Sequence, residues 1–269
     1  MSPSLQRFHF IEVMITWHGY VNTTHLTRFF NIQRQAASRT FGNYKKQHPS
    51  AILYDESVKG FVPDSHFKCR YSAQQFSEYQ LLTKKQTPLA MAGIIDIPLP
   101  TRNPNPKLAQ PILRAIEDTR AIDIGYTSLS NPQYSDRIIE PHSLIFDGMR
   151  WHVRAYCQQN GDYRDFVLSR FNGEASDEAK ATHCIADDEK WHQFLDIEII
   201  PDPRLTQAQQ DVIALDYQMK NAKCVITTRV PLINYLLKRL RLDTYATNPL
   251  AQQIVLSEHS RQQIAPYTY

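Results

Sequence analysis

The chain has 269 residues, 42% of them hydrophobic and 21% charged, and its formal net charge is +3. This composition excludes a disordered, collagen-like or fibrous protein, and the length predicts about two folded domains, although three small ones also fit. No run approaches the roughly 18 apolar residues of a membrane helix, and the N-terminus lacks the apolar stretch of a secretory signal. We therefore expect a cytoplasmic protein with no membrane partner.

The basic residues are concentrated near the N-terminus. Residues 1–70 contain nine Lys and Arg against four Asp and Glu, which gives +5, and the rest of the chain carries 21 against 23, or −2. A local excess of this size is typical of a nucleic-acid-binding module, although a solvated surface with no partner has the same composition.

Two short helices are predicted at the start of this basic region. The first has apolar residues three or four positions apart and ends near Gly19. The second begins after Asn22, a good N-cap residue, with Val21 placed to pack against the helix that follows. The residues predicted to face the core are Leu5, Phe8, Ile11 and Ile15 in the first helix and Leu26, Phe29 and Phe30 in the second.

A third helix is predicted over residues 33–47, with Ala37, Phe41 and Tyr44 inside and polar or basic residues outside. A tight turn separates it from the second helix, as in a helix-turn-helix, whose second helix enters the major groove of DNA. Residues 51–64 then predict two short strands around a polar turn, the wing of a winged helix. The alternative is a solvated helix face that binds nothing. The candidate DNA-binding residues are Thr23, Thr24, Arg34, Gln35, Ser38, Arg39, Asn43, Lys45 and Lys46, with Lys59 at the tip of the wing.

A connector is predicted over residues 71–106. It starts with the spacing of a helix that buries Phe76, Tyr79 and Leu82, and five of the sixteen prolines follow within residues 88–106. Because proline removes a backbone donor and breaks helices, this second part should be extended and mark a domain boundary.

Residues 107–190 begin with one helix and continue with several strands. The strand segments are rich in β-branched and aromatic residues and are bounded by Asn-Pro, Asp-Gly or Asn-Gly turns. They predict a small antiparallel sheet or barrel with one helix.

Residues 191–269 alternate short strands and helices, which predicts a small α+β sandwich. In its first helix Thr206 and Gln209 form a capping box, and Val212 and Leu215 are predicted on the inner row. The segment has no phosphate loop, paired metal ligands or nucleophile elbow. Assembly or pocket closure is therefore its expected role.

Residues 115–171 resemble the WYL domain of transcriptional regulators. They carry a helix, a strand ending in Tyr-x-Ser, the pattern Arg-x-Ile-x-Pro-His from Arg137, Phe-Asp-Gly, an aromatic-rich strand, and Asp-Phe-x-x-x-Arg from Asp165. The tripeptide that names the domain is Trp-His-Val at 151–153, which departs at two of three positions. The N-terminal part, with Gln-x-Ala-Ser in its third helix, also resembles the winged helix of this family, in particular the branch that regulates bacterial anti-phage defence operons.

The resemblance extends to the C-terminal extension domain and implies an α+β chain with four parts. It also implies a homodimer that represses transcription, and we expect it to read an inverted repeat in double-stranded operator DNA with half-sites about 34–36 Å apart or a multiple of that. The central barrel is implied to sense a ligand. The implied parts are a winged helix-turn-helix (1–70), the connector (71–106), an Sm-like β-barrel (107–190) and a dimerisation domain (191–269).

Seven arginines and no lysine lie between residues 112 and 171. Arginine binds phosphates and base edges through a planar fork, so this choice favours a nucleotide-like or oligonucleotide effector. Strand alternation places Arg150, His152 and Arg154 on one polar face. The alternative is that the arginines pair with the eight Asp and Glu of this segment and that the histidines are structural. The candidate ligand-binding residues are Tyr126, Ser128, Arg137, His142, Arg150, His152, Arg154, Arg164 and Arg170.

Two other functions compete with a regulator. A nuclease or hydrolase could use His142, Asp147 and His152, but these residues lack metal-ligand spacing and the chain has no Gly-rich phosphate loop. An RNA-binding adaptor could stack single-stranded RNA on arginines and aromatic rings. The four cysteines include no C-x-x-C pair, which predicts neither a zinc site nor a disulfide framework. We expect a protein that is not an enzyme and uses no metal or cofactor.

Overall fold

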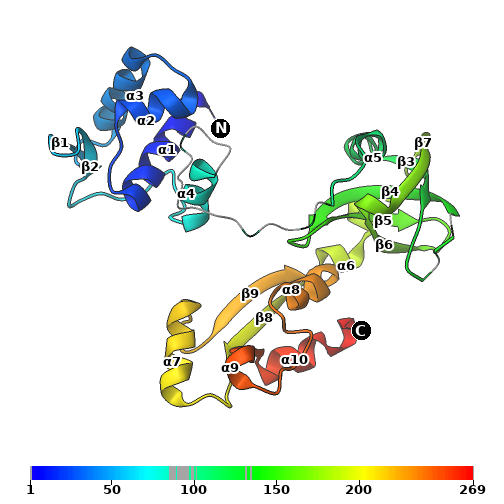
Figure 1. Cartoon of the computed structure of the whole chain (residues 1–269). Helices are drawn as coiled ribbons and strands as arrows, with labels where there is room; N and C mark the ends of the chain where they lie inside the picture. The colour runs from blue at the N-terminus through cyan, green and yellow to red at the C-terminus, as the bar shows by residue number, and fades with distance from the viewer. Residues whose placement is uncertain are drawn as a thin grey trace. The chain divides into compact units, whose positions relative to one another are not determined.

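The computed structural model describes residues 2–84, 89, 97, 100, 102–130, 132–133 and 135–268. The chain divides into two compact units, residues 1–98 and 99–269. The first contains the N-terminal helices and a hairpin, and the second contains the middle and C-terminal domains (Figure 1). None of the described helices is long and apolar enough to span a membrane.

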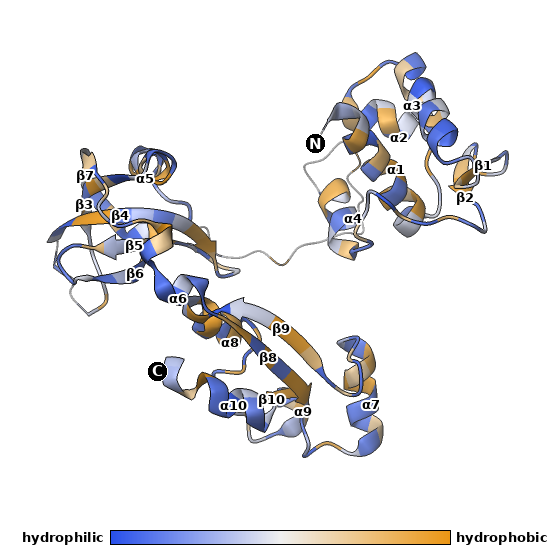
Figure 2. Cartoon of the chain, turned by 180° about the vertical axis from the view of Figure 1, so that it is seen from behind, coloured by the Kyte–Doolittle hydropathy of each residue, from blue (hydrophilic) through white to orange (hydrophobic). Residues whose placement is uncertain are grey.

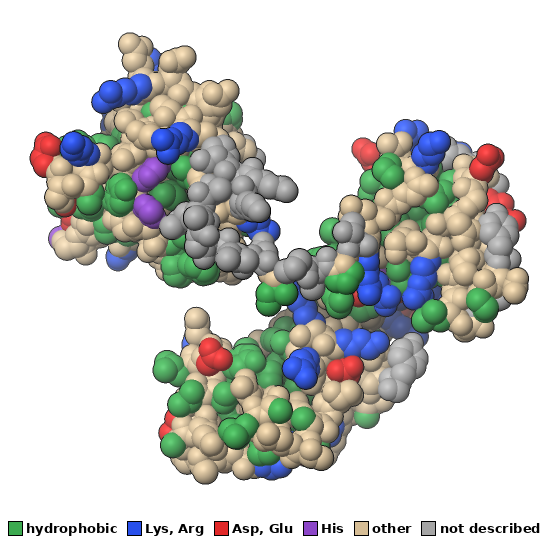
Figure 3. Space-filling model, viewed as in Figure 1, with side chains coloured by type: hydrophobic (Ala, Val, Ile, Leu, Met, Phe, Trp, Pro, Cys, Tyr) green, Lys and Arg blue, Asp and Glu red, His purple; other side chains and the backbone are tan. Residues whose placement is uncertain are grey.

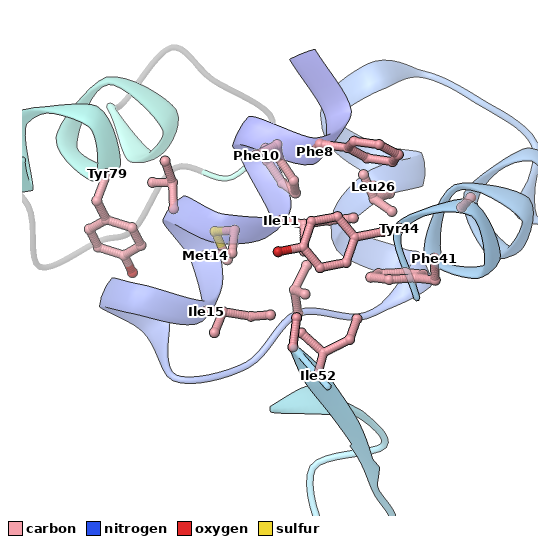
Figure 4. Packing of buried hydrophobic residues seen from close by; sticks show 14 residues of the cluster. Phe8, Phe10, Ile11, Met14, Ile15, Leu26, Phe41, Tyr44, Ile52 and Tyr79 are labelled. Carbon is pink, nitrogen blue, oxygen red and sulfur yellow. The ribbon is translucent and has the colours of Figure 1, made fainter. Parts of the chain in front are cut away.

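The N-terminal unit is a winged helix with an aromatic core. Phe8, Leu26, Phe41 and Tyr44 pack together from the three helices, as Figure 4 shows, and this confirms most of the predicted inner faces. The predicted end of the first helix is also confirmed, because Gly19 closes it with φ of +83°. The elements are α1 (Pro3–His18), α2 (Thr23–Phe30), α3 (Arg34–Gln47), β1 (Ile52–Asp55), β2 (Gly60–Pro63) and α4 (Phe76–Thr83).

The cap of α2 forms as predicted. The side chain of Asn22 accepts a hydrogen bond from the backbone N–H of His25 (3.1 Å), and Nδ1 of His25 accepts one from the N–H of Asn22 (3.4 Å). Val21 and Leu26 are both buried in the core. The start of the helix-turn-helix is thus fixed by local hydrogen bonds and by apolar packing.

The wing is an antiparallel hairpin held against the rest of the unit. Asp55 pairs with Gly60 across its turn, and Phe61 exchanges two backbone hydrogen bonds with Val21 (2.9 and 2.7 Å). The Phe61 ring also stacks on Phe41 of α3, with centroids 4.5 Å apart. A Cβ on Gly60 would lie only 3.0 Å from the carbonyl oxygen of Val21, so the hairpin approaches α2 as closely as glycine allows.

Helix α4, which lies within the predicted connector 71–106, packs against the N-terminal core. Tyr79 of α4 is buried in the N-terminal core, and Glu78 bonds His9 of α1 (2.7 Å). The helix therefore belongs to the winged-helix unit, because its aromatic face completes that core. Most of the proline-rich stretch 88–106 lies outside the described residues.

Two residues predicted inside this unit are instead exposed. Leu5 is 39% exposed because the first turn of α1 extends beyond the core, and Phe76 is 56% exposed at the start of α4. Phe76 contacts the ring of Trp17, which is itself partly exposed (centroids 5.2 Å). Both residues lie in the first turns of their helices, where the apolar face of the helix extends beyond the core.

A buried carboxylate ties α1 to α3 and to the chain that follows the wing. One oxygen of Glu12 accepts a hydrogen bond from the Tyr44 hydroxyl (2.9 Å). The other accepts from the backbone N–H groups of Arg70, Tyr71 and Ser72 at 2.6–3.0 Å. A charge with no exposed surface is tolerated only when it is so fully hydrogen-bonded.

The middle domain is one helix on a five-stranded antiparallel sheet. The strand order is β6-β5-β4-β3-β7, so the first strand of the domain pairs with the second and with the last. Helix α5 is capped by the side chain of Asn105 and buries Leu108 and Ile112 against the sheet. The predicted sheet with one helix is confirmed. The elements are α5 (Pro106–Asp118), β3 (Arg120–Tyr126), β4 (Ser135–Phe146), β5 (Trp151–Cys157), β6 (Asp162–Val167) and β7 (Phe171–Lys180).

The C-terminal domain is a three-stranded antiparallel sheet, ordered β10-β8-β9, with short helices around it. Its core contains Ile197, Ile233 and Leu237, and Figure 2 shows the hydrophobic residues of β8 and β9. The alternating pattern predicted for this domain is confirmed, as is the capping box of Thr206 and Gln209. The elements are α6 (Glu189–His192), β8 (Phe194–Pro201), α7 (Gln207–Asp216), β9 (Cys224–Arg229), α8 (Ile233–Arg239), α9 (Pro249–Gln252), β10 (Ile254–Leu256) and α10 (Glu258–Ile264).

The predicted inner row of α7 is wrong. Val212 is 63% exposed and Leu215 is 80% exposed, and no residue of α7 is fully buried. The apolar residues do share one helix face, as their spacing predicts, but that face is turned to the surface and away from the sheet of the same chain.

Candidate nucleic-acid interface and sensor site

The outer face of α3 carries the predicted DNA-binding residues at the surface. Phe41 and Tyr44 anchor the opposite face of the helix in the core, which fixes how α3 is rotated. Polar and basic side chains on the outside of a helix of 14 residues match what the major groove accepts. The exposed candidates on α3 are Arg34, Gln35, Ser38, Arg39, Asn43, Lys45 and Lys46.

A hollow of about 760 Å³ lies on the wing side of α3. It brings together Lys45 from α3, Lys59 from the wing and Thr24 from α2, three residues predicted from separate segments. Its lining contains no acidic residue. The lining residues are Asn22, Thr23, Thr24, Thr27, Arg34, Ser38, Phe41, Gly42, Lys45, Tyr54, Lys59, Gly60 and Phe61.

A second hollow, of about 320 Å³, lies on the α1 side of α3 and also lacks acidic residues. It contains Arg39 and Asn43, which were predicted, and Arg7, which was not. The only signal in the sequence is that Arg7 is the sole Lys or Arg among the first 27 residues. The lining residues are Pro3, Ser4, Arg7, Ala36, Arg39, Thr40 and Asn43.

The middle domain contains a buried network centred on Arg154. Its guanidinium donates two hydrogen bonds to Asp188 (2.7 and 3.1 Å) and one to Asp165 (3.1 Å). Asp188 lies just before α6 and also accepts a bond from the backbone N–H of Trp191. His142 contacts the same carboxylate at 3.3 Å. The predicted cationic face exists, but acidic side chains of this chain already occupy Arg154.

The network continues into the C-terminal domain. Tyr235 of α8 donates a hydrogen bond to Asp165 (2.9 Å), and its hydroxyl lies 3.3 Å from Nδ1 of His152. Nε2 of His152 contacts Asp147 at 2.9 Å, and Arg150 pairs with the same carboxylate at 3.5 Å. These bonds join the two domains of the second unit through one continuous polar cluster.

The charges of the network follow from burial and from its hydrogen bonds. Burial raises the pKa of Asp188, but hydrogen bonds and charge from Arg154 outweigh it and hold this pKa below its ordinary value. The same balance, with hydrogen bonds from His152 and two backbone N–H groups, lowers the pKa of Asp147 to about 2. Burial lowers the pKa of His142, which the nearby Asp188 only partly opposes. At neutral pH, ionised Asp188 therefore lies between charged Arg154 and neutral His142.

The other predicted ligand residues lie outside this network. Tyr126 is buried among Phe166 and Phe171, and its hydroxyl accepts a bond from the N–H of Val167 (3.1 Å). Arg164 is opposite Ala155 in the ladder, so it faces the other side of the sheet from Arg154, whose partner is Asp165. The nine predicted residues do not form one pocket.

Three arginines of this domain keep their charge free of ion pairs among the described residues. The guanidinium carbon of Arg137 lies 6.0 Å from the centre of the Tyr126 ring, and Arg137 donates to the amide oxygen of Asn160 (3.4 Å). Its Nε is buried without a hydrogen-bond partner in the part of the chain that the structure describes. Arg164 is exposed, and Arg170 is partly exposed at the end of β3, where its carbonyl accepts a bond from the N–H of Thr127. Ser128 follows at the same end and is partly buried.

Sequence reasoning missed Asp188 and Tyr235, which hold the network together. Asp188 is 34 residues from Arg154, and Tyr235 is 83 residues from His152. The count of acidic residues indicated possible partners, but no local pattern selects these two. Among the described residues, no three His, Cys, Asp or Glu side chains are placed to hold a metal ion. Of the three residues proposed for an enzyme, His152 contacts Asp147, whereas His142 contacts Asp188 instead.

Three family models match successive parts of the chain. The winged helix-turn-helix domain of the BrxR transcriptional regulator matches residues 4–85, the WYL domain matches residues 107–173, and the BrxR C-terminal dimerization domain matches residues 194–264. The first match includes α4, in agreement with its packing.

Relatives match over nearly the whole length. The DNA-binding transcriptional repressor CapW of Escherichia coli is 32% identical over 272 residues, which cover 96% of this chain and 90% of the relative. Proteins of the same description from Pseudomonas aeruginosa and Stenotrophomonas maltophilia are 29% and 28% identical with the same coverage. The succession of a winged helix, a WYL domain and a C-terminal domain, together with this identity, shows that the chain belongs to the CapW family of WYL-domain transcriptional repressors.

Proposed function

We propose that this protein is a dimeric repressor that places α3 in the major groove of an inverted-repeat operator. We also propose that it represses an anti-phage defence operon. The observation that supports this most is the exposed polar and basic face of α3, bordered on both sides by hollows that contain no acidic residue. Backbone phosphates carry the negative charge of DNA, so a basic surface without acidic residues attracts a duplex to α3.

The positions on α3 divide into two kinds of contact. Arg39 lies in the middle of the exposed face, where a guanidinium can pair with guanine O6 and N7. Lys46 lies in the last turn, close to the helix end, and suits a phosphate. Base contacts determine sequence preference, whereas phosphate contacts strengthen binding to any DNA.

Two substitutions on α3 test this assignment. Arg39→Ala should weaken operator binding by about 1–3 kcal/mol and relax sequence preference, because a bidentate base contact is lost. Lys46→Ala should weaken specific and non-specific binding alike. The measurement is a gel shift with the duplex upstream of the gene for this chain, against a scrambled duplex.

Arg28→Ala is the matched control, since Arg28 is an exposed arginine of α2 that lines neither hollow. It should bind as the wild type does. Unchanged affinity in both α3 variants would remove α3 as the recognition helix. Equal binding to an RNA duplex of the same sequence would instead support an RNA-binding adaptor, because A-form RNA offers no readable major groove.

For the WYL domain, we propose that an anionic, nucleotide-like effector binds the arginines that the buried network leaves free. Arg137, Arg164 and Arg170 have no carboxylate partner among the described residues, whereas Arg154 has two. An incoming phosphate therefore meets no competing acid at these three, and arginine forks bind phosphate in bidentate fashion. Figure 3 shows several Lys and Arg side chains on the visible face of this domain.

Nucleotides and a single-stranded oligonucleotide should raise the melting temperature of the second unit. At a ligand concentration of 100 times Kd, the free energy of unfolding should rise by about 2.7 kcal/mol. Arg137→Gln and Arg170→Gln should each reduce this gain and leave DNA binding intact. Arg114→Gln, which removes an exposed arginine on α5, should not reduce it. If no member of the panel stabilises the protein, the effector is not a nucleotide. Equal losses in all three variants would mean that net charge alone attracts the ligand.

A further inference from the structure

The hollow between α1 and α3 has the features of a second phosphate site. It is lined by two arginines and one asparagine, with no acidic side chain. Neither Arg7 nor Arg39 forms an ion pair within the part of the N-terminal unit that the structure describes. Because Arg39 is assigned to a base edge, Arg7 is the uncompensated cation that this concave surface offers to an anion.

Arg7 is held in place without having its charge satisfied. Its guanidinium carbon lies 5.9 Å from the centre of the Phe30 ring, and its Nε is buried with no hydrogen-bond partner among the described residues. The aromatic ring fixes the side chain, because a guanidinium is attracted to the face of a ring. The buried Nε cannot meet a ligand, but the two terminal NH2 groups of Arg7 form no hydrogen bond among the described residues, and these donors are left for a phosphate.

The dimensions of α3 and of DNA place this hollow under a phosphate backbone. A helix with its side chains is about 10–12 Å wide, and the major groove is about 12 Å wide, so a helix seated in it has one strand of phosphates along each side. If α3 is seated in this way, the wing-side hollow with Lys45 and Lys59 faces one of these strands. The hollow with Arg7 lies on the other side of the same helix.

We propose that Arg7, with Asn43 beside it, binds a phosphate of the strand across the groove from the one that Lys45 and Lys59 contact. Helix α1 thereby contributes to the DNA interface, and α3 is clamped from both sides. The inference rests on the proposed placement of α3 in the major groove. A phosphate is the chemical group that fits, since Arg7 stands beside α3 where the base edges do not reach.

The test combines three variants with two measurements. Arg7→Met keeps the aliphatic stem over Phe30 but removes the charge and the donors. Lys59→Ala removes the wing-side cation, and Arg28→Ala is the control outside both hollows. Binding to a random-sequence duplex is measured against salt concentration, and phosphate-ethylation interference is mapped on each strand of the duplex upstream of the gene. Thermal unfolding of each variant confirms that its fold is intact.

Arg7→Met should weaken binding by about 10- to 150-fold for each protomer bound, the usual cost of a hydrogen bond to a charged group. It should lower the slope of log K against log salt by about 0.9 for each protomer bound. Within each half-site, interference should disappear at phosphates of one strand in Arg7→Met and of the opposite strand in Lys59→Ala. Arg28→Ala should change neither measurement.

Two results would overturn the proposal in distinguishable ways. If Lys59→Ala weakens binding while Arg7→Met keeps wild-type affinity and slope, α3 is correctly placed and only the clamp fails. If both variants bind as the wild type does, the placement of α3 itself is wrong. Loss of interference on the same strand of a half-site in both variants would also contradict the clamp.

Discussion

Arg154→Ala is expected to lower the free energy of unfolding of the second unit by about 3–5 kcal/mol, because removing one partner of a buried ion pair leaves the other uncompensated. The substitution leaves two carboxylates, Asp188 and Asp165, without the guanidinium that neutralises them. Asp188 is almost fully buried, so water cannot take over that role. The measurement is calorimetry of the full chain, in which the transition of the second unit should shift to lower temperature while that of the winged helix stays.

Arg164→Ala is the control for this prediction. Arg164 is exposed on the adjacent strand and has no ion pair among the described residues, so its loss should change stability by no more than about 0.5 kcal/mol. A stable Arg154→Ala variant would mean that the pairs with Asp188 and Asp165 do not hold the fold. The cationic face would then be open to a ligand, as strand alternation alone predicts.

The second large effect concerns dimerisation through α7. Val212 and Leu215 form an apolar row that the chain leaves exposed, within the residues matched by a dimerization-domain model. In a two-fold dimer the same patch meets itself, and an apolar helix face of a second copy is the partner that such a row fits. We therefore expect α7 to pack against α7 of the partner.

Leu215→Asp should weaken the dimer by about 3–6 kcal/mol, since a buried leucine contributes about 1.5–3 kcal/mol and symmetry counts the loss twice. Light scattering at micromolar concentration should then report a monomer. Operator affinity should fall by a factor of about 10²–10⁴, because the second half-site no longer benefits from effective concentration.

Leu250→Asp is the matched control, as Leu250 is a comparably exposed leucine of the same domain on α9. It should remain dimeric. A dimeric Leu215→Asp would show that α7 is not the interface. A monomeric Leu250→Asp beside a dimeric Leu215→Asp would place the interface at α9.

Local patterns were sufficient to predict the winged helix and the order of the elements that follow. Phe8, Leu26 and Phe41 recur at helical spacing, and Asn22 marks the start of α2, so periodicity and capping identify the three helices and their inner faces. The outer face of α3 follows directly, because once one side of a helix is anchored the other is determined. Strand alternation likewise separated Arg154 from its neighbours Val153 and Ala155.

The sequence could not predict which acidic residues pair with Arg154, or that the apolar face of α7 lies at the surface. Arg154 is surrounded by acidic residues in the sequence, and the choice of Asp188 depends on how the chain after β7 returns to the sheet. Leu215 has the spacing of a core residue, and periodicity does not distinguish a helix buried in its own domain from one covered by a partner. Both questions are decided by tertiary and quaternary contacts that leave no local signal.

Asp188 couples the effects of substitutions at residues that are far apart in the sequence. Its carboxylate serves Arg154, His142 and the first turn of α6 at the same time. A substitution at any of these positions changes what the others must tolerate, so their effects cannot be additive. We therefore expect strong epistasis between Arg154 and Asp188: a double substitution of this pair should cost less than the sum of the two single ones, which ties changes in the middle domain to the segment that leads into the C-terminal domain.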